Sequence, residues 1–271
     1  MFARAFITRL GLVAVVLCLG GAARVAHAFE IVPHRAVYDL SFAGAKGNSQ
    51  VVDVNGSMVF EWEDACDGWS VTQRTAMSFS YQSGDTVSLG WNLVTWESKD
   101  GLRYRFFIRN MQNGDVKEEY RGEARLDGPG QGGVADYTVP EGRKVELPPG
   151  TLFPTAHTVA LLKHIEAGES FLWATIFDGF EEDGVSDISA LVTKSLGVEA
   201  KTAGRSPLLS SVASNRVHLA FFKHSDGSTE PEHEQQLRLH MNGIVESIVL
   251  DFGDFNVEGK LKELKELKPP C

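Results

Sequence analysis

The feature that most constrains the fold of this chain is a series of short turn signals between segments of alternating polarity. Asn or Asp followed by Gly recurs along the chain, as at Asn55-Gly56, Asp67-Gly68, Asp100-Gly101, Asn113-Gly114, Asp183-Gly184, Asp226-Gly227 and Asn242-Gly243. Such pairs tolerate the left-handed backbone of tight hairpins. The chain is therefore expected to fold mainly as consecutive antiparallel strands.

The segments between these signals have the period of two that is typical of half-buried strands. Met77, Phe79 and Tyr81 alternate with polar residues, as do the apolar residues of segment 87–93. Further strands are expected at 171–177, 185–193, 216–222, 234–241, 244–252 and 255–261. Composition alone would also allow a short helix at 260–268, but Phe255, Val257 and Leu261 favour a terminal strand.

Two hairpins can be tested for register. A two-residue turn at Asp100-Gly101 places Ile108 opposite Leu93, an apolar pair, and Arg105 opposite Trp96, a cation near an aromatic ring. At Asn113-Gly114 the same turn would place apolar residues opposite charged ones. A bulged loop with a left-handed Gly114 avoids this mismatch and pairs Ile108 with Tyr120.

The second hairpin carries a polar face of mixed charge: Arg103, Arg105, Arg109, Lys117, Glu119, Arg121, Glu123 and Arg125. It could bind an anionic ligand, or it could be a solvated face of weak ion pairs, each worth about 0–1 kcal/mol. The interleaved glutamates, which would face Arg109 and Arg105, favour the solvated face.

One helix is expected at about 154–167. Pro154 and Thr155 are common near helix starts, Val159, Leu162 and Ile165 recur at helical spacing, and Gly168 is a plausible stop. Its apolar stripe could cover one opening of the sheet.

The first 28 residues have the order of a secretory signal. Arg4 and Arg9 precede the apolar run 10–19, and Ala26-His27-Ala28 is an A-x-A cleavage site. Cys18 follows Leu17, which is too large for a lipoprotein site, so it is expected to leave with the signal. Removal takes the formal net charge from −10 to −13, since the signal holds three Arg and no acids. We expect a soluble periplasmic chain after cleavage, without a transmembrane segment and without nucleic acid as partner.

The mature chain, 29–271, is expected to form a single domain. It keeps two cysteines, Cys66 and Cys271. In an oxidising compartment such a pair favours a disulfide, with a free redox thiol as the alternative.

The sequence offers no catalytic constellation. Seven histidines remain: His34, His157, His164, His218, His224, His233 and His240. His157 and His164 are two turns apart, not one, and Leu237 stands where a zincin motif starting at His233 needs its second histidine. Segment 128–133 spells G-x-G-x-x-G but no helix is expected after it. The acidic cluster Asp178, Glu181, Glu182, Asp183 and Asp187 lacks EF-hand spacing and favours a solvated turn over a calcium site. We expect no enzyme activity, cofactor or metal.

Several segments resemble the cell-envelope-integrity B family, periplasmic proteins of Gram-negative bacteria. They are the 33–38 opening Pro-His-Arg-Ala-Val-Tyr, the segment 150–158, the Gly253-Asp254-Phe255 strand start and the closing Pro-Pro-Cys. The resemblance implies a large antiparallel β-spiral of about 12–14 strands, an open-barrel meander with one helical insertion and a Cys66–Cys271 disulfide. It also implies a role in envelope integrity and a fold similar to that of lipoprotein carriers, but no ligand-binding residues.

Three functions compete at this stage. The first is an envelope factor that binds an apolar ligand, a lipid or a lipoprotein acyl chain, or a partner protein over a curved sheet. The second is a structural module that holds another periplasmic protein through sheet edges or an exposed patch. The third is an unrecognised hydrolase, for which no motif is present. The first fails if the concave face is filled by the protein's own side chains.

Overall fold

The computed structural model describes residues 31–268 and 271, except residue 48 and the segments 181–183, 199–205 and 225–228. The expected signal peptide and its Cys18 lie outside the described residues. Among those described, no helix is long and apolar enough to cross a bilayer.

In the described part of the chain, a single 14-stranded antiparallel sheet makes up the fold. Its strands are β1 (His34–Ala45), β2 (Val51–Asp64), β3 (Gly68–Tyr81), β4 (Thr86–Ser98), β5 (Arg103–Gln112), β6 (Asp115–Leu126), β7 (Gly133–Val139), β8 (Lys144–Leu147), β9 (Phe171–Phe177), β10 (Val185–Gly197), β11 (Ser214–Lys223), β12 (His233–His240), β13 (Val245–Asp251) and β14 (Phe255–Glu266). The helices are α1 (Pro154–Glu166) and the short α2 (Pro207–Ser210). The mainly β fold with one disulfide is as predicted. The short helix α2 was not predicted from the sequence.

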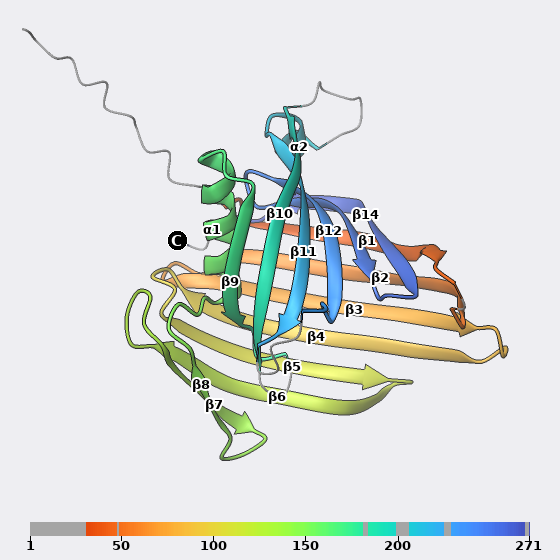
Figure 1. Ribbon diagram of the computed structural model, residues 1–271, viewed down its shortest axis with the longest axis horizontal. Helices are drawn as coiled ribbons and strands as arrows, with labels where there is room; N and C mark the ends of the chain where they lie inside the picture. The colour runs from red at the N-terminus through yellow and green to blue at the C-terminus, as the bar shows by residue number, and fades with distance from the viewer. Residues whose placement is uncertain (1–30, 48, 181–183, 199–205, 225–228, 269–270) are drawn as a thin grey trace, which may run out of the picture.

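The chain builds this sheet as two meanders. Strands β1 to β8 and β9 to β14 each pair with the next strand, and β1 pairs with β14 to join the two halves. In Figure 1 the strands β9–β12 run steeply across β3–β6, so the sheet folds back over itself. The edge strand β9 is bridged by Leu152, whose N–H donates to the Thr175 carbonyl at 2.9 Å. The result is a nearly closed barrel.

Both predicted registers are present. Leu93 pairs with Ile108 and Trp96 with Arg105, and Ile108 pairs with Tyr120. The second hairpin reaches its register differently from the prediction. Gln112 pairs with Asp115 across a two-residue turn in which Asn113 and Gly114 both have positive φ, and the register shifts between Asn110 and Met111, inside the paired strands. The bulge therefore lies in the strand and not in the loop.

One turn prediction is wrong. Asn55-Gly56 lies inside β2, where Gly56 pairs with Met77. A Cβ at Gly56 would lie 2.4 Å from the Ala76 carbonyl oxygen, so the glycine allows close strand packing instead of a reversal. The pairs at 100–101, 113–114 and 242–243 do lie between strands, whereas Asp183 and the pair at 226–227 lie outside the described residues.

Helix α1 has the expected start and stop but an unexpected cap. Phe153 precedes it in an extended conformation without a side-chain cap, and Pro154 occupies the first turn. At the other end Gly168 has a φ of +78° and its N–H donates to the Ile165 carbonyl. The helix packs Leu161 and Leu162 against an apolar cluster formed mainly by β9–β12.

The core falls into three groups of buried side chains. One joins β5–β8 to Phe153, Phe177 and Val185, with the Tyr104 and Phe153 rings stacked at 5.1 Å. The second lies on β1–β3 and β14, and the third lies under α1. A space remains between the walls formed by the second and third groups.

Candidate functional site

The most prominent feature of the interior is a cavity of about 750 Å³ between the two meanders. One wall comes from β1–β4, whose inward side chains follow the period of two. They are His34, Tyr38, Leu40, Met58, Phe60, Trp62, Gln73, Thr75, Trp91 and Leu93. Paired residues of an antiparallel sheet share a face, so the pairs Tyr38–Met58 and Gln73–Leu93 point into the same space.

The opposite wall comes from the second meander and from α1. Strands β11–β13 contribute mainly aliphatic side chains: Leu219, Phe221, Leu237, Leu239, Val245, Ile248 and Leu250. Helix α1 adds His157, Thr158 and Leu161. The cavity is thus lined mainly by apolar and aromatic side chains with a few polar groups, the composition of small-molecule sites.

Two residues of this lining each carry a fully buried ring nitrogen that has no hydrogen-bond partner among the described residues. These nitrogens are Nε1 of Trp62 and Nε2 of His157, on side chains that are buried. Burial lowers the pKa of His157 to about 4, so its imidazole is neutral near pH 7. By contrast, the Gln73 Nε2 donates to the Thr75 hydroxyl at 3.2 Å, which satisfies that polar pair within the wall.

Two further histidines line the cavity. His34 Nδ1 lies 2.7 Å from the Val32 carbonyl oxygen, and burial lowers the pKa of this imidazole. His233 stacks on Phe221 with ring centres 4.2 Å apart, and burial lowers its pKa against the opposing charge of Glu232. Both rings therefore favour the neutral form, and no carboxylate of the described residues holds either one in the manner of a catalytic dyad.

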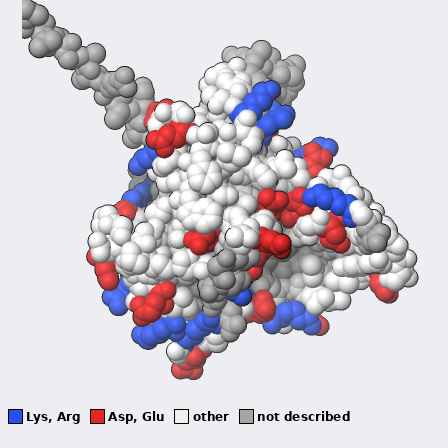
Figure 2. Space-filling model, in the orientation of Figure 1, with Lys and Arg blue, Asp and Glu red and all other residues white. Residues whose placement is uncertain are grey.

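The charged side chains in the lining are all acidic: Asp178, Glu232, Glu234 and Asp251. Asp251 is paired with Lys46 at 2.7 Å, and Glu234 contacts His218 at 3.3 Å. None of the described lining residues is Lys or Arg. On the face drawn in Figure 2, Asp and Glu side chains gather in the middle of the molecule beside a hollow in its surface. The described lining residues therefore carry acidic groups without basic ones, although Lys46 from outside the lining neutralises Asp251.

Glu97 fixes the helix that closes one end of the cavity. Its carboxylate accepts hydrogen bonds from the Thr155 N–H at 2.7 Å and the Ala156 N–H at 2.8 Å, at the positive end of α1. Burial nevertheless dominates and raises the pKa of Glu97 to about 7. A strand residue thus supplies the cap that Phe153 does not.

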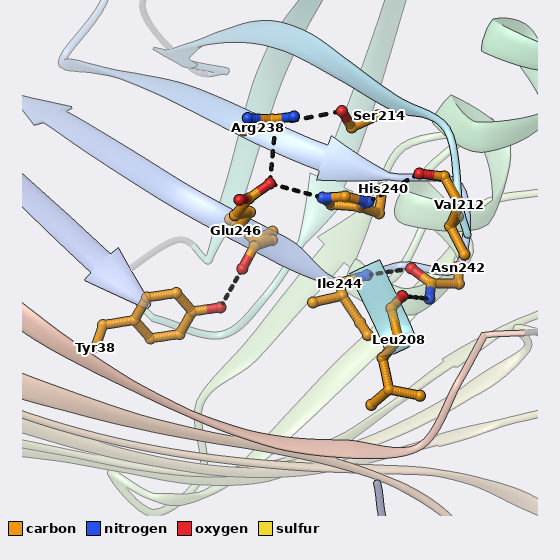
Figure 3. A network of polar contacts seen from close by, with 10 residues as sticks. Tyr38, Leu208, Val212, Ser214, Arg238, His240, Asn242, Ile244 and Glu246 are labelled. Carbon is orange, nitrogen blue, oxygen red and sulfur yellow. Dashed lines mark hydrogen bonds and ion pairs between the residues drawn. The ribbon is translucent and has the colours of Figure 1, made fainter. Parts of the chain in front are cut away.

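A polar network fixes the far end of the β12–β13 hairpin (Figure 3). Glu246 is the extra residue of a β-bulge, because Leu239 pairs with Val245 but Arg238 pairs with Ser247. Its carboxylate contacts Arg238 Nε and His240 Nε2, each at 2.9 Å. The Tyr38 hydroxyl donates to the Val245 carbonyl at 2.6 Å, which ties the two cavity walls together.

The structure places the other predicted site residues as follows. Cys66 and Cys271 form a disulfide with Cα atoms 5.9 Å apart. His157 is buried in the cavity wall, whereas His164 is partly exposed and lies 3.1 Å from Glu169, so the two are not brought together. His224 contacts Asp187 at 3.0 Å. Residues 181–183 of the acidic cluster lie outside the described residues.

The two partial motifs found in the sequence, G-x-G-x-x-G at 128–133 and the zincin-like start at His233, form no site among the described residues. Gly133 begins strand β7, not a helix, so 128–133 is a loop. His233 and Leu237 lie on strand β12, not on a zincin helix. The charged face of β5–β6 is exposed and holds ion pairs such as Arg109–Glu119 at 2.7 Å, and Arg121 lies over the Phe107 ring. This arrangement agrees with the solvated face.

Comparison with known proteins fits this architecture. A model of EipB-like proteins matches residues 25–268. The chain belongs to the EipB-like family. It is 31% identical over 252 residues to the cell envelope integrity protein EipB of Brucella abortus (strain 2308), an alignment that covers 90% of this chain and 87% of that protein. The resemblance predicted from the sequence is confirmed.

A solved structure shows the same fold in the EipB-like family. The crystal structure of a β-barrel-like protein, a domain of unknown function from Brucella abortus, matches with a TM-score of 0.80 and 29% sequence identity. The match covers 89% of this chain and 100% of that one.

Sequence reasoning missed Glu97 and Trp62 as members of the EipB-like interior. A signal was present for Glu97. Trp91, Leu93 and Thr95 alternate on the inward face of β4, and Glu97 continues that register with a charged residue. A carboxylate in an inward position requires a partner, which here is the start of α1. The unpartnered Trp62 gave no comparable signal, because an aromatic residue fits the inward pattern.

Proposed function

We propose that the protein is a non-enzymatic periplasmic factor of envelope integrity that binds an apolar ligand, a lipid or a lipoprotein acyl chain, in the cavity between its two meanders. The observation that carries this proposal is the cavity of about 750 Å³, with one wall from each half of the sheet. Its volume falls within the range of about 300–1,000 Å³ that is typical of ligand sites.

The energetics of such a ligand are reasonable. Burying a chain of about 14 methylenes gains about 11 kcal/mol at about 0.8 kcal/mol per group. Association costs about 4 kcal/mol or more. The difference is at most about 7 kcal/mol, which corresponds to a Kd of about 10 μM or weaker and permits release as well as capture.

Three observations support this location. The sequence has the ordered regions of a secretory signal before residue 29. The relative from Brucella abortus is named as a cell envelope integrity protein. A disulfide between Cys66 and Cys271 is also typical of a protein that works in an oxidising compartment.

A second candidate function is docking to a periplasmic protein. Phe171, Trp173 and Leu191 lie on β9 and β10 at the edge of the sheet and are all exposed. Exposed apolar groups beside an edge strand are typical of protein contacts. Crosslinking of the native protein followed by purification would recover a stoichiometric partner without lipid if this surface is the functional one.

Native mass spectrometry of the protein from the periplasm tests the first candidate. We expect a mass that begins at Phe29 and carries a lipid-sized adduct. Leu93→Trp fills the cavity from β4 and should abolish the adduct. Val94→Trp is the matched control, since Val94 is 42% exposed on the other face of the same strand, and it should keep the adduct. Wild-type protein without any adduct, under conditions where a delipidated sample also binds no added lipid, would contradict the proposal.

A further inference from the structure

The cavity runs along the whole β12–β13 hairpin. Its lining includes Leu239 and Val245 beside the turn of the hairpin, and Glu232 and Phe252 at the opposite end. The two strands are paired over this length, so they form one continuous wall. A strand rises about 3.3 Å per residue, so the wall from Leu239 to His233 is about 20 Å long. The cavity is therefore elongated in the direction of these strands.

The turn end of this elongated cavity is closed. A Cβ at Gly243 would lie 3.4 Å from the Ile31 side chain and 3.5 Å from the Trp62 ring, so the turn packs directly against both of these buried residues. Asn242 is also buried, and its Nδ2 donates to the Leu208 carbonyl at 2.9 Å (Figure 3). These contacts hold the turn in place and make this end of the cavity a blind end.

The opposite end of the cavity reaches the surface. Glu232 is exposed and Phe252 is 42% exposed, although both residues line the cavity. The inward side chains of β12 also change in polarity in this direction, from Leu237 near the turn to Gln235 and His233 near the open end. A ligand with one polar end therefore fits with its apolar tail toward the turn and its polar end toward solvent.

A β-bulge directs Val245 into the blind end. Glu246 is the extra residue, so Val245 shares the inward face with Ile248, as both line the cavity. A regular strand would instead place Val245 on the same face as Ser247 and Val249, which lie outside the lining. The bulge thus puts an aliphatic side chain where the end of an inserted tail would lie.

We propose that the cavity takes one linear acyl chain tail-first, and that Val245 at the blind end limits the length of that chain. This inference rests on the proposed function and specifies its ligand. With C–C bonds of about 1.5 Å, an extended chain advances about 1.25 Å per methylene, so about 20 Å accommodates about 16 carbons. A free single-chain lipid and one acyl chain of a lipoprotein share this chemistry.

Displacement of a neutral apolar dye, N-phenyl-1-naphthylamine, from the delipidated mature protein tests the inference. The competitors are monoacylglycerols with chains of 10 to 20 carbons, each below its micellar concentration. We expect the affinity to rise about 4-fold for each added methylene up to about 16 carbons, and then to stop rising. A rise that continues to 20 carbons would overturn the inference, because it would show that the tail meets no blind end. A monopalmitoyl lipopeptide distinguishes the two sources: tighter binding than monopalmitoylglycerol assigns the protein-linked chain, and equal or weaker binding assigns the free lipid.

Variants locate the blind end. Val245→Phe should shorten the longest fitting chain by about two carbons and weaken monopalmitoylglycerol by about 16-fold, while the 10-carbon ester keeps its affinity. Val249→Phe is the matched control, since it makes the same change outside the lining of the same strand, and it should leave the length limit unchanged. Leu239→Ala should move the limit to longer chains, and it decides the outcome if Val245→Phe does not fold. A length limit that neither Val245→Phe nor Leu239→Ala moves would overturn this inference alone, whereas failure of the wild type to bind dye or lipid would overturn the proposed function.

Discussion

Glu97 and His157 are buried titratable side chains at the beginning of α1, and burial shifts the pKa of each toward its neutral form. The pKa of Glu97 rises from 4.5 to about 7, so its ionisation costs stability as the pH rises between these values. The pKa of His157 falls from 6.5 to about 4, so its protonation costs stability as the pH falls through that window. Each contribution amounts to about 3 kcal/mol, and between pH 4.5 and 6.5 they oppose each other.

Single substitutions should separate these two contributions. The Glu97→Gln variant keeps only the contribution of His157, so its Tm should fall more steeply than that of wild type as the pH drops from 6.5 to 4. The His157→Leu variant keeps only the contribution of Glu97, so its Tm should fall relative to that of wild type as the pH rises from 4.5 to 7. Thermal unfolding at fixed ionic strength measures both differences against wild type, which carries the other shifted histidines unchanged. Variant curves parallel to that of wild type would show that neither group titrates as described.

At the scale of elements, the β12–β13 hairpin depends on the bulge that turns Glu246 toward Arg238 and His240 (Figure 3). Glu246→Gln removes the charge from both contacts, and His240 is almost fully buried. We expect the free energy of unfolding to fall by about 1–3 kcal/mol in urea denaturation. Glu123→Gln is the control, because the Arg105–Glu123 pair is exposed and 3.7 Å apart, and it should change stability by less than about 0.5 kcal/mol. Equal effects of the two substitutions would refute a structural role for the network.

Elements were also the scale at which the sequence was most informative. Alternation and turn chemistry together predicted the pairing of Leu93 with Ile108, because a one-residue slip would have exposed every apolar side chain. The turn predicted at Gly56 was wrong, because the sequence alone does not distinguish a glycine that allows two strands to pack closely from one that reverses the chain. The bulge at Glu246 was not predictable, because its cause is a network that includes the distant Val212 and Ser214.

At the scale of the whole molecule, the pairing of β1 with β14 joins residues such as His34 and Glu266. A period of two indicates which side chains share a face but not which strand lies beside them, so this pairing followed from no local signal. The cavity depends on it, because the walls belong to different halves of the chain. Aromatic residues such as Trp91 and Phe60 would have suited a filled core equally well. The existence of the cavity therefore required the structure.

The Cys66–Cys271 disulfide should act on this long-range closure. It links residues 205 positions apart, from the β2–β3 turn to the end of the chain beyond β14. Cys66→Ser/Cys271→Ser lengthens the loop that must close before β1 and β14 can pair. We expect the free energy of unfolding to fall by up to about 5 kcal/mol. We also expect refolding to slow more than unfolding accelerates, since the bridge restrains the unfolded chain.

Urea unfolding and stopped-flow refolding of the double variant test this expectation, and reduced wild-type protein is the matched control. Both forms should keep the far-UV spectrum of the oxidised protein, because β14 retains its pairs with β1 and β13. An unchanged stability would show that the sheet alone holds the chain ends together. A faster unfolding rate with unchanged refolding would instead place the effect of the bridge in the folded state, where it would act by preventing β14 from separating from β1.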